Sequence, residues 1–426
     1  MRSSSPARLG VLTVGMGAVS TTLFAGVEAM RRGQAAPIGS LTQLGQLPLT
    51  APPGTKTRKV SAIIDLAPLD GIVFGGWDVI ETDARAAAVR AGVLTREDLA
   101  RHGKFLRTIV AFPGVANPRF TVRVAASRVK PVRSLRAQVE AIRADIRAFR
   151  RRERCTRLVV LCAMSVEAYV PPSTVHRSLA AFEAGLRSDD PAIAPSQLYA
   201  YAALREGAPF VNGTPNVTAE TPALQELARR AGVPLAGSDF KSGQTYLKTV
   251  IAAGLRNRLL GLDGWFSTNI LGNRDGDVLE DPQAFAAKRA TKTGVLADIC
   301  RADLYPELYR HIEHLVKINY YPPRGDNKEA WDSVDLRGWL GYPMQIKINF
   351  QCRDSILAAP LALDLVLLAD AAARAGASGL IDWLGFFFKS PVVRGARKPS
   401  NDPNLQLAAL EREIGRLAAR RRRTRR

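Results

Sequence analysis

Polar residues that can hold a phosphate gather before one predicted helix. The segment 238–245 reads Ser-Asp-Phe-Lys-Ser-Gly-Gln-Thr, and 246–253 has the composition of a helix. Hydroxyl groups and free backbone N–H groups at a helix N-terminus bind phosphate well, because the N–H groups point at the anion and the helix dipole favours negative charge. The same residues are also typical of an ordinary N-cap. The turn therefore indicates a phosphate site only if other residues support it.

Lysines in the same half of the chain supply that support. Lys288 and Lys292 are spaced so that both ammonium groups can share one helix face, Lys328 ends a polar turn, and Lys389 follows the phenylalanines 386–388. A lysine that is partly desolvated among aromatic rings or beside other cations has a lowered pKa and can exchange protons near neutrality. Each of them alone is more often a surface residue with a packed stem. Together they suit a phosphorylated sugar whose hydroxyl protons must move.

A second group of residues, near the N-terminus, is typical of nucleotide binding. Gly15-Met-Gly17-Ala-Val-Ser20 is a G-x-G-x-x-S variant of the dinucleotide fingerprint, between a predicted strand at 9–14 and a predicted helix at 18–30. Glycines let the backbone turn tightly and approach a pyrophosphate, although a turn without a ligand has the same pattern. The acidic residue expected about 20 positions later is absent. The next carboxylate suited to a ribose is Asp78.

Strand-like and helix-like segments alternate along the first 240 residues. Apolar residues at 158–162 and 207–211 predict strands, and 179–186 and 222–231 predict helices. This alternation predicts an α/β fold with a Rossmann-like, doubly wound sheet.

The texture of the sequence changes in its second half. From about 246 to 350 we expect polar loops mixed with short strands, among them 344–350, and then an apolar helix at 355–373. The resulting division is a nucleotide-binding domain, an inserted α+β lobe, a return to the first domain and a basic, disordered tail, at 1–240, 241–352, 353–410 and 411–426.

The positive charge is concentrated in two segments. The 426 residues carry a net charge of +21, of which 14 charges lie in 128–157 and 410–426. Because the remaining body is only mildly basic, we interpret these segments as a solvated helix face and a terminal run rather than as contacts for nucleic acid or acidic lipid.

The cysteines and histidines indicate the cellular compartment and whether a metal site is expected. The four cysteines are too few and too scattered for a disulfide framework or a paired Cys-x-x-Cys zinc site, which predicts a reducing compartment, the cytoplasm. His311 and His314 lie three residues apart without a carboxylate-bearing zinc motif, so we predict no metal site and leave an ion requirement open. No stretch reaches the roughly 18 continuous apolar residues of a membrane helix.

These segments together resemble the inositol-3-phosphate synthase (myo-inositol-1-phosphate synthase) family, in the same order from about residue 8 to 391. The similar segments are LGVLTVGMGAVSTT, FGGWD, VNGTPN, SDFKSGQT, NILGNRDG, YYPPRGDNK, QCRDSILAAPLALDL and FFFKSP. The resemblance implies NAD-dependent conversion of glucose 6-phosphate to an inositol phosphate through oxidation at C5, enolisation, aldol cyclisation and re-reduction, in inositol biosynthesis. It also implies a homotetramer formed through the inserted lobe.

The resemblance assigns roles position by position. The substrate phosphate would be held by Ser242, Gly243, Gln244, Thr245 and Lys292. The sugar site and its proton transfers would use Asp239, Asn273, Lys288, Lys328, Asp354 and Lys389. NAD would contact Gly15, Gly17, Ala18, Val19, Asp78 and Asp275. Within the sugar site we expect Lys389 and Lys288 at the C5 oxygen, and Lys328 with Asp239 at C1.

Two segments depart from the family pattern. Residues 162–165 read Cys-Ala-Met-Ser in place of a Trp-Thr-Ala-Asn-type run, and Ile270 replaces a histidine. Two other hypotheses stay open: an NAD-linked dehydrogenase or isomerase of another sugar phosphate on the same scaffold, and a non-catalytic scaffold protein that binds anionic partners through its basic segments.

Overall fold

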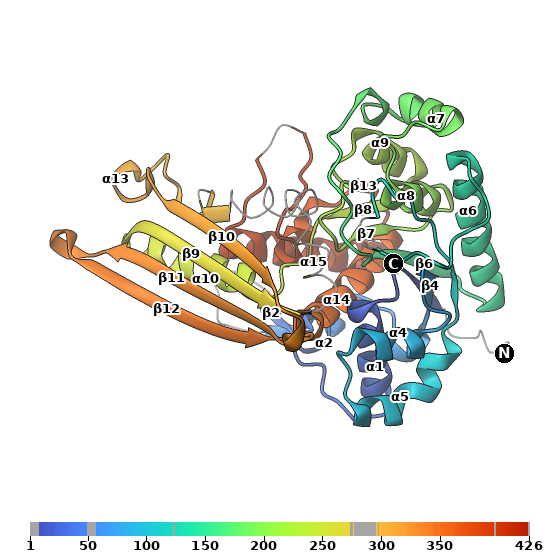
Figure 1. Cartoon of the computed structure of the whole chain (residues 1–426), viewed down its shortest axis with the longest axis horizontal. Coiled ribbons are helices and arrows are strands. Elements are labelled where there is room, and N and C mark those ends of the chain that lie inside the picture. The colour runs from blue at the N-terminus through green and yellow to red at the C-terminus, as the bar shows by residue number, and fades with distance from the viewer. Residues whose placement is uncertain are drawn as a thin grey trace.

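A computed structural model describes residues 8–48, 57–121, 124–272, 276, 295–296, 298–395 and 398–424. The chain forms two sheets of different character, one parallel and flanked by helices, the other mostly antiparallel and extending away from it (Figure 1).

The parallel sheet has seven strands in the order β13-β8-β7-β6-β1-β4-β5. Their bounds are β1 Leu9–Val14, β4 Ile72–Asp78, β5 Ala111–Pro113, β6 Arg157–Cys162, β7 Phe210–Asn212, β8 Pro234–Gly237 and β13 Gly379–Leu380. Because β1 pairs with β4 on one side and with β6 on the other, the strand order reverses at β1. This is the doubly wound α/β topology that the sequence predicts, and ligands bind at its switch point.

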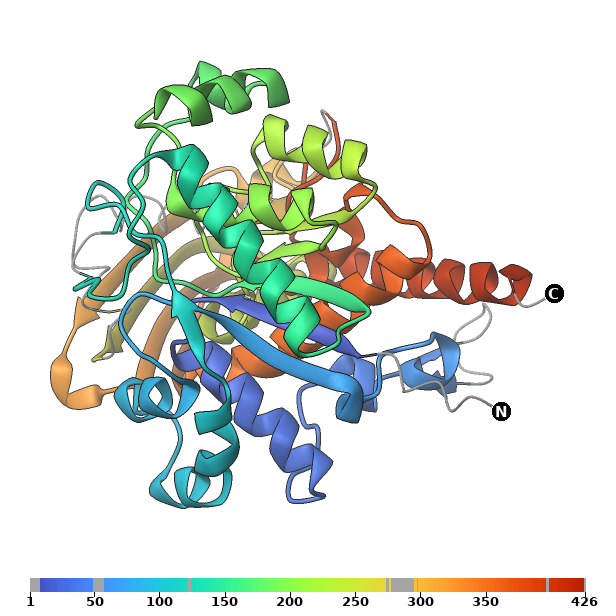
Figure 2. The same ribbon diagram turned by 90° about the vertical axis from the view of Figure 1, so that its right-hand side faces the viewer.

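Helices cover both faces of this sheet (Figures 1 and 2). One face carries α1 Ala18–Arg31, α4 Ala84–Ala91, α5 Arg96–Thr108 and α14 Asp354–Arg374; the other carries α6 Leu135–Arg152, α7 Leu179–Ser188, α8 Pro195–Arg205 and α9 Pro222–Ala231. Alternate side chains of one strand enter the two cores, since Val11 packs on the first face and Leu12 on the second. A strand buried on both faces is apolar throughout, which is why 9–14 and 158–162 could be identified from composition.

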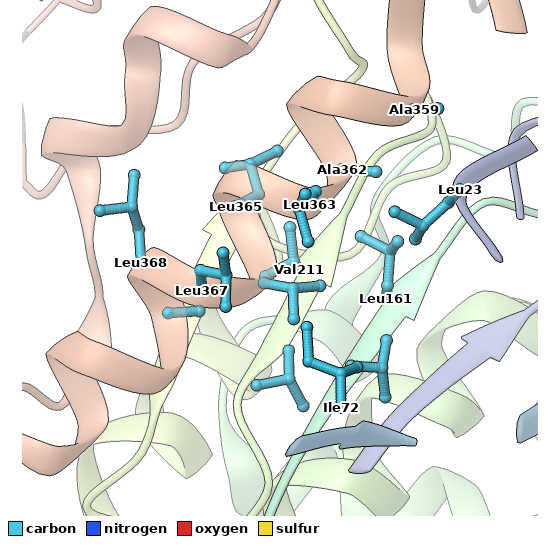
Figure 3. Close-up of a cluster of buried hydrophobic side chains, with 14 of the residues drawn as sticks. Leu23, Ile72, Leu161, Val211, Ala359, Ala362, Leu363, Leu365, Leu367 and Leu368 are labelled. Atoms are coloured by element: carbon cyan, nitrogen blue, oxygen red, sulfur yellow. The ribbon is translucent and has the colours of Figure 1, made fainter. Parts of the chain in front are cut away.

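Helix α14 is the centre of one core. Figure 3 shows Leu363 and Leu367 of this helix pointing toward the sheet near Val211, and Leu161 of the sheet belongs to the same buried cluster. The helix is long and apolar enough to cross a membrane by length and composition, but 72% of its most apolar window is buried inside the protein. The sequence did not indicate a membrane helix here because Asp364 and Asp370 interrupt the run of apolar residues. The core helix of a folded domain has the same composition.

The second sheet has four strands in the order β10-β9-β11-β12. They are β9 Gly261–Leu271, β10 Glu313–Tyr320, β11 Lys328–Arg337 and β12 Pro343–Cys352, and only the β9–β10 pair is parallel. The expected strand at 344–350 is confirmed as part of β12, but the other strands of the sheet are longer than the short strands and polar loops that we expected, because strands with one exposed face carry alternating polar residues that resemble loop sequence. Helix α10 Gly243–Asn257 packs on one face, where Ala252, Leu262 and Val334 form a separate core.

Short elements connect these layers. They are α2 Leu41–Leu44, β2 Gln46–Pro48, β3 Thr57–Lys59, α3 Val60–Ile63, α13 Pro306–Tyr309, and the 3₁₀ segments η1 Leu69–Gly71, η2 Thr174–His176, η3 Pro322–Arg324, η4 Trp339–Gly341 and η5 Asp382–Phe387. Because several of them lie between α1 and β4, the second strand of the Rossmann pattern begins late, at Ile72.

The C-terminal segment is a helix as far as the structure describes it. Helix α15 Pro403–Thr424 projects from the body in Figure 2, and its Leu410 and Ile414 are fully buried. The expectation of a disordered tail from residue 411 is therefore corrected. Leu410, Ile414 and Leu417 recur at helical spacing and pack on the first core, a stripe that the arginine run concealed.

Candidate active site

The glycine-rich turn lies at the carboxyl end of β1. Gly15 has a φ of +86°, and a Cβ there would come within 2.7 Å of Met164 Cα, so a side chain would collide with backbone. Gly17 is the N-cap of α1, whose first turn contains no acidic residue. Since the first N–H groups of a helix have no partner within it, they are available to a pyrophosphate here.

Asp78 lies beside this turn despite its distance in sequence. It ends β4, the neighbour of β1, and its Oδ2 accepts a hydrogen bond of 3.0 Å from Met16 N–H. Its Oδ1 accepts from Ile80 and Glu81 N–H, each at 2.8 Å. The end of the second Rossmann strand is where a ribose-binding carboxylate belongs, so the insertion before β4 explains the missing acid at the usual spacing.

One cavity joins the nucleotide turn to the lysine motifs. It has a volume of about 750 Å³, and its lining includes nine of the residues that the sequence selected: Gly15, Gly17, Ala18, Val19, Asp78, Asp239, Ser242, Asp354 and Lys389. These residues come from the carboxyl ends of β1 and β4, from the starts of α1, α10 and α14, and from the segments that follow β8 and η5. The topology thus brings together motifs that are more than 300 residues apart, as Gly15 and Lys389 are.

Lys389 and Asp239 form one ion pair of the site. Lys389 Nζ lies 3.3 Å from Asp239 Oδ1, and both side chains are mostly buried. The backbone holds them in register, because Lys389 N–H donates to Asp239 O at 2.7 Å. The other carboxylate oxygen of Asp239 is buried and has no hydrogen-bond partner within the described part of the chain. An acceptor in that condition, on a cavity wall, fits a ligand hydroxyl.

Lys328 and Asp354 form a second pair at the start of α10. Lys328 Nζ donates to Asp354 Oδ2 at 2.8 Å. A Cβ on Gly243 would lie 2.6 Å from Asp354 Oδ1, and Gly243 has a φ of +53°, so glycine is required for this approach. We expected Lys328 to act with Asp239, but the structure pairs Lys328 with Asp354 and Asp239 with Lys389, since the two carboxylates lie on different elements.

The predicted phosphate-binding residues occupy the first turn of α10. Ser242 is the N-cap, and its side chain makes no capping hydrogen bond. Gln244 and Thr245 are buried, and the Gln244 carboxamide is bonded to Asn269 and Asp332. The turn can therefore offer backbone N–H groups and the Ser242 hydroxyl to an anion, whereas the side chain of Gln244 already has its partners.

Four predicted site residues lie outside the described residues. They are Asn273, Asp275, Lys288 and Lys292. Their roles stay predictions.

Lysines with a lowered pKa are found where the sequence did not indicate them. Burial lowers the pKa of Lys241 to about 7 and that of Lys248 to about 8. Lys241 lies inside the phosphate motif and Lys248 one helical turn after Gln244. In the sequence, a lysine among apolar residues was the only sign of a lowered pKa. That sign does not distinguish a buried ammonium group from one that reaches solvent.

Two acidic residues of the cavity were also missed. Asp326 belongs to the quoted motif before Lys328, and Glu167 follows the Cys-Ala-Met-Ser departure. Burial raises the pKa of Glu167 to about 7, although its oxygens accept from Ser196 Oγ and N–H. Because Ser196 lies in the first turn of α8, Glu167 also stabilises that helix N-terminus.

The site fits a bound dinucleotide. The glycine turn lines the cavity without side chains at Gly15 and Gly17, the first turn of α1 offers N–H groups, and Asp78 ends the second Rossmann strand, where a carboxylate can meet a ribose. Ala163, Met164 and Ser165, which depart from the family pattern, line the same cavity, so the departure changes its wall without closing it.

Comparison with known proteins agrees with this geometry. A family model described as Myo-inositol-1-phosphate synthase, an NAD-binding family, matches residues 9–414. Inositol-3-phosphate synthase 1 of Bacteroides thetaiotaomicron is 48% identical over 397 residues, covering 93% of this chain and 92% of the relative. Inositol-3-phosphate synthase 1 of Oryza sativa is 35% identical and is covered over 75% of its length.

A solved structure gives the same result. Inositol-3-phosphate synthase of Caenorhabditis elegans superposes with a TM-score of 0.90 at 28% identity, covering 97% of this chain and 86% of that chain. The chain belongs to the myo-inositol-1-phosphate synthase family.

Proposed function

We propose that this protein converts D-glucose 6-phosphate to 1D-myo-inositol 3-phosphate with NAD as its cofactor. The observation that carries the proposal is the single cavity lined both by the glycine-rich turn with Asp78 and by Lys389, Asp239 and Asp354. A cofactor that removes and returns a hydride must lie against the sugar it oxidises, and this cavity has space for both.

Bound NAD supplies the acceptor for the hydride of C5 and the donor for the final reduction. The unpartnered Oδ2 of Asp239 accepts the hydrogen bond of the C5 hydroxyl and takes up its proton as the hydride leaves, while the Lys389 ammonium, paired with Oδ1, opposes the negative charge that develops on the C5 oxygen. Fixed charges here need no reorganisation during the reaction, because backbone and side-chain contacts already hold both residues.

The second pair serves the later steps. The Lys328 ammonium, held by Asp354, stabilises the negative charge that develops on the C1 oxygen as C6 attacks the aldehyde. Asp354 lies against Gly243, so the same contact places Lys328 near the N–H groups of α10 that bind the phosphate. Phosphate binding and cyclisation thus use adjacent parts of one wall.

Two lysine variants test this assignment. Lys328→Ala and Lys389→Ala should each lower kcat by about 100-fold or more while NAD binding and the melting temperature stay close to those of the wild type. Lys104→Ala is the matched control, because Lys104 is an exposed lysine on α5, away from the cavity and the four-stranded sheet. Near-wild-type formation of inositol phosphate by either variant would refute the role of that lysine.

Cofactor turnover separates the proposal from the dehydrogenase alternative. With glucose 6-phosphate and catalytic NAD, the wild type should form inositol phosphate without accumulating NADH, since the hydride returns to the sugar. NADH formed in proportion to the sugar consumed would support the dehydrogenase instead.

A homotetramer is proposed through the four-stranded sheet. Its exposed apolar side chains include Leu315 on β10, Met344 on β12 and Trp339 between β11 and β12. Several exposed apolar residues on one sheet favour its burial against another copy of the chain. Light scattering should give about four times the chain mass of 46.2 kDa.

The free state of all four cysteines supports a reducing compartment, and we propose the cytoplasm.

A further inference from the structure

A buried carboxylate lies behind the phosphate-binding turn, outside the cavity. Asp332 on β11 is 3% exposed, and it accepts three hydrogen bonds. Its Oδ1 accepts from Trp265 Nε1 at 2.7 Å and from Ser267 Oγ at 2.5 Å, and its Oδ2 accepts from Gln244 Nε2 at 2.9 Å. The proposed chemistry gives this residue no role, yet a buried charge is retained only where its partners are well placed.

A buried lysine completes the network on the other side. Lys248 Nζ donates to Ser267 Oγ at 3.0 Å, lies 2.7 Å from His314 Nε2 and stands over the Trp265 ring. Ser267 uses its one hydrogen toward Asp332 and its lone pairs toward Lys248, so the hydroxyl links the two charged groups. The charge of Asp332 is thereby opposed inside the lobe, without help from solvent.

The network ends on Gln244. Its Nε2 donates to Asp332 and its Oε1 accepts from Asn269 Nδ2 at 2.7 Å, so both ends of the carboxamide are held. Gln244 is the second residue of α10, one residue after Gly243. Fixing this side chain therefore fixes the first turn, whose N–H groups face the proposed phosphate position.

We propose that Asp332 is a positioning residue for the substrate phosphate: through the Gln244 carboxamide it orients the N–H groups of the first turn of α10. This inference rests on the proposed function, which places the phosphate at that turn. Asp332 acts from β11 and does not touch the ligand, so its effect reaches binding of the phosphate rather than binding of NAD.

The hydrogen-bond inventory explains why a carboxylate is needed. Trp265 Nε1 and Gln244 Nε2 can only donate, and Ser267 must donate to Asp332 if it is to accept from Lys248. An asparagine would replace one of the two acceptor oxygens with a donor. In one orientation of the amide Gln244 Nε2 would lose its acceptor, and in the other both Trp265 Nε1 and Ser267 Oγ would lose theirs.

Asp332→Asn tests the inference, with Asp335→Asn as the matched control. Asp335 is on the same strand, but it is exposed. Asp332→Asn should raise both the KM for glucose 6-phosphate and the inhibition constant of inorganic phosphate by about tenfold or more. The dissociation constant of NAD should stay unchanged and kcat should change much less than KM, as expected for lost uniform binding. Asp335→Asn should leave all four quantities unchanged.

An exchanged pair provides a rescue that a merely structural role would not predict. Asp332→Asn combined with Gln244→Glu puts the amide and the carboxylate in each other's place, so that every donor regains an acceptor and the net charge is kept. The double variant should recover at least part of the phosphate affinity that Asp332→Asn loses, whereas Gln244→Glu alone should lose affinity because two carboxylates then face each other.

Milder and negative outcomes are also decisive. If Asp332→Asn does not fold, Ser267→Ala removes one donor and the link to Lys248, and it should raise the same two constants by a smaller factor. Unchanged constants for the folded variant, or an equal loss of NAD affinity, would overturn the inference. The proposed function would still stand in that case if Lys328→Ala and Lys389→Ala lack turnover.

Discussion

Lys241→Met should make the protein more stable than the wild type. This gain in the free energy of unfolding should be larger near neutral pH than at high pH. The Lys241 ammonium is inside the phosphate motif, and the residue is 5% exposed. Its Nζ donates to Gln406 on α15, and Asp298 is the carboxylate that acts on its charge. A hydrogen bond to the Gln406 amide oxygen and the more distant charge of Asp298 do not replace the hydration that the ammonium loses on burial.

The magnitude follows from the difference in proton binding. The unfolded chain binds the lysine proton with a pKa of 10.5, and burial lowers the pKa to about 7 in the folded protein. Between these values the unfolded state holds a proton that the folded state lacks, so the free energy of unfolding rises with pH by up to about 1.4 kcal/mol per pH unit. At pH 7 and below, the buried charge costs the folded state up to about 5 kcal/mol relative to a neutral side chain.

Thermal unfolding at several pH values measures this contribution. Lys241→Met removes the titration and loses one hydrogen bond, worth about 1–2 kcal/mol. The stability advantage of the variant should therefore shrink by about 3 kcal/mol between pH 7 and pH 9.5, or roughly 3 °C in melting temperature for a chain of this length. Lys104→Met, on the exposed side of α5, is the control, and its melting temperature should differ from that of the wild type equally at every pH. A pH-independent difference for Lys241→Met would show that the buried lysine binds its proton normally and would refute the reasoning.

Two further changes test the walls of the site and the C-terminal helix. Gly243→Ala should raise the KM for glucose 6-phosphate about tenfold or more, because the added Cβ would lie 2.6 Å from Asp354 Oδ1 at a φ of +53°. Steady-state kinetics at saturating NAD measure this KM, and an unchanged value would contradict the tight contact. Removing residues 416–426 should leave kcat/KM nearly unchanged, since the fully buried Leu410 and Ile414 remain; a tenfold or greater loss would make this end of the chain part of the active site.

The sequence predicted most of the parallel domain. Strands buried on both faces are apolar without interruption, and the glycine-rich turn has a steric reason at Gly15. The bounds of β1 and α9 agree with the expected segments, and the expected strand at 158–162 is β6 with one more residue at its start. Motif order also placed nine predicted residues on one cavity, although no spacing rule could place Asp78 beside Met16 across the insertion.

The inserted lobe and the ion pairs were harder to predict. Its strands alternate polar and apolar residues, so Lys328 and Asp332 read as loop or surface positions. Which carboxylate pairs with which lysine depends on backbone pairings between distant segments. Lys328 pairs with Cys352, just before Asp354, and the Phe240–Phe388 bridge brings Lys389 to Asp239. These pairings leave no local pattern in either segment. The same is true of the C-terminal helix, whose buried residues Leu410 and Ile414 stand among charged neighbours.

The inner face of the inserted sheet changes character along its length. On β11 the inward residues run from Lys328 through Ala330 and Asp332 to Val334 and Leu336, so polar residues stand near the cavity and apolar residues far from it. On the paired strand β9, Asn269 and Ser267 are likewise followed by Trp265 and Leu262 with distance from the cavity, although Leu271 at its cavity end is apolar. The far half supplies the burial that holds the lobe together.

The half near the cavity buries less apolar surface, and its polar residues hold neighbouring groups in place instead. A leucine at Asp332 would remove a buried charge and could stabilise the lobe, because apolar replacements of buried ionic groups are often neutral or stabilising when their partners are replaced as well. The partners here include Gln244, whose carboxamide would lose the acceptor that orients the first turn of α10. The proposed role of this network in orienting the first turn of α10 gives a reason for a charged group at this depth, whereas stability alone gives none.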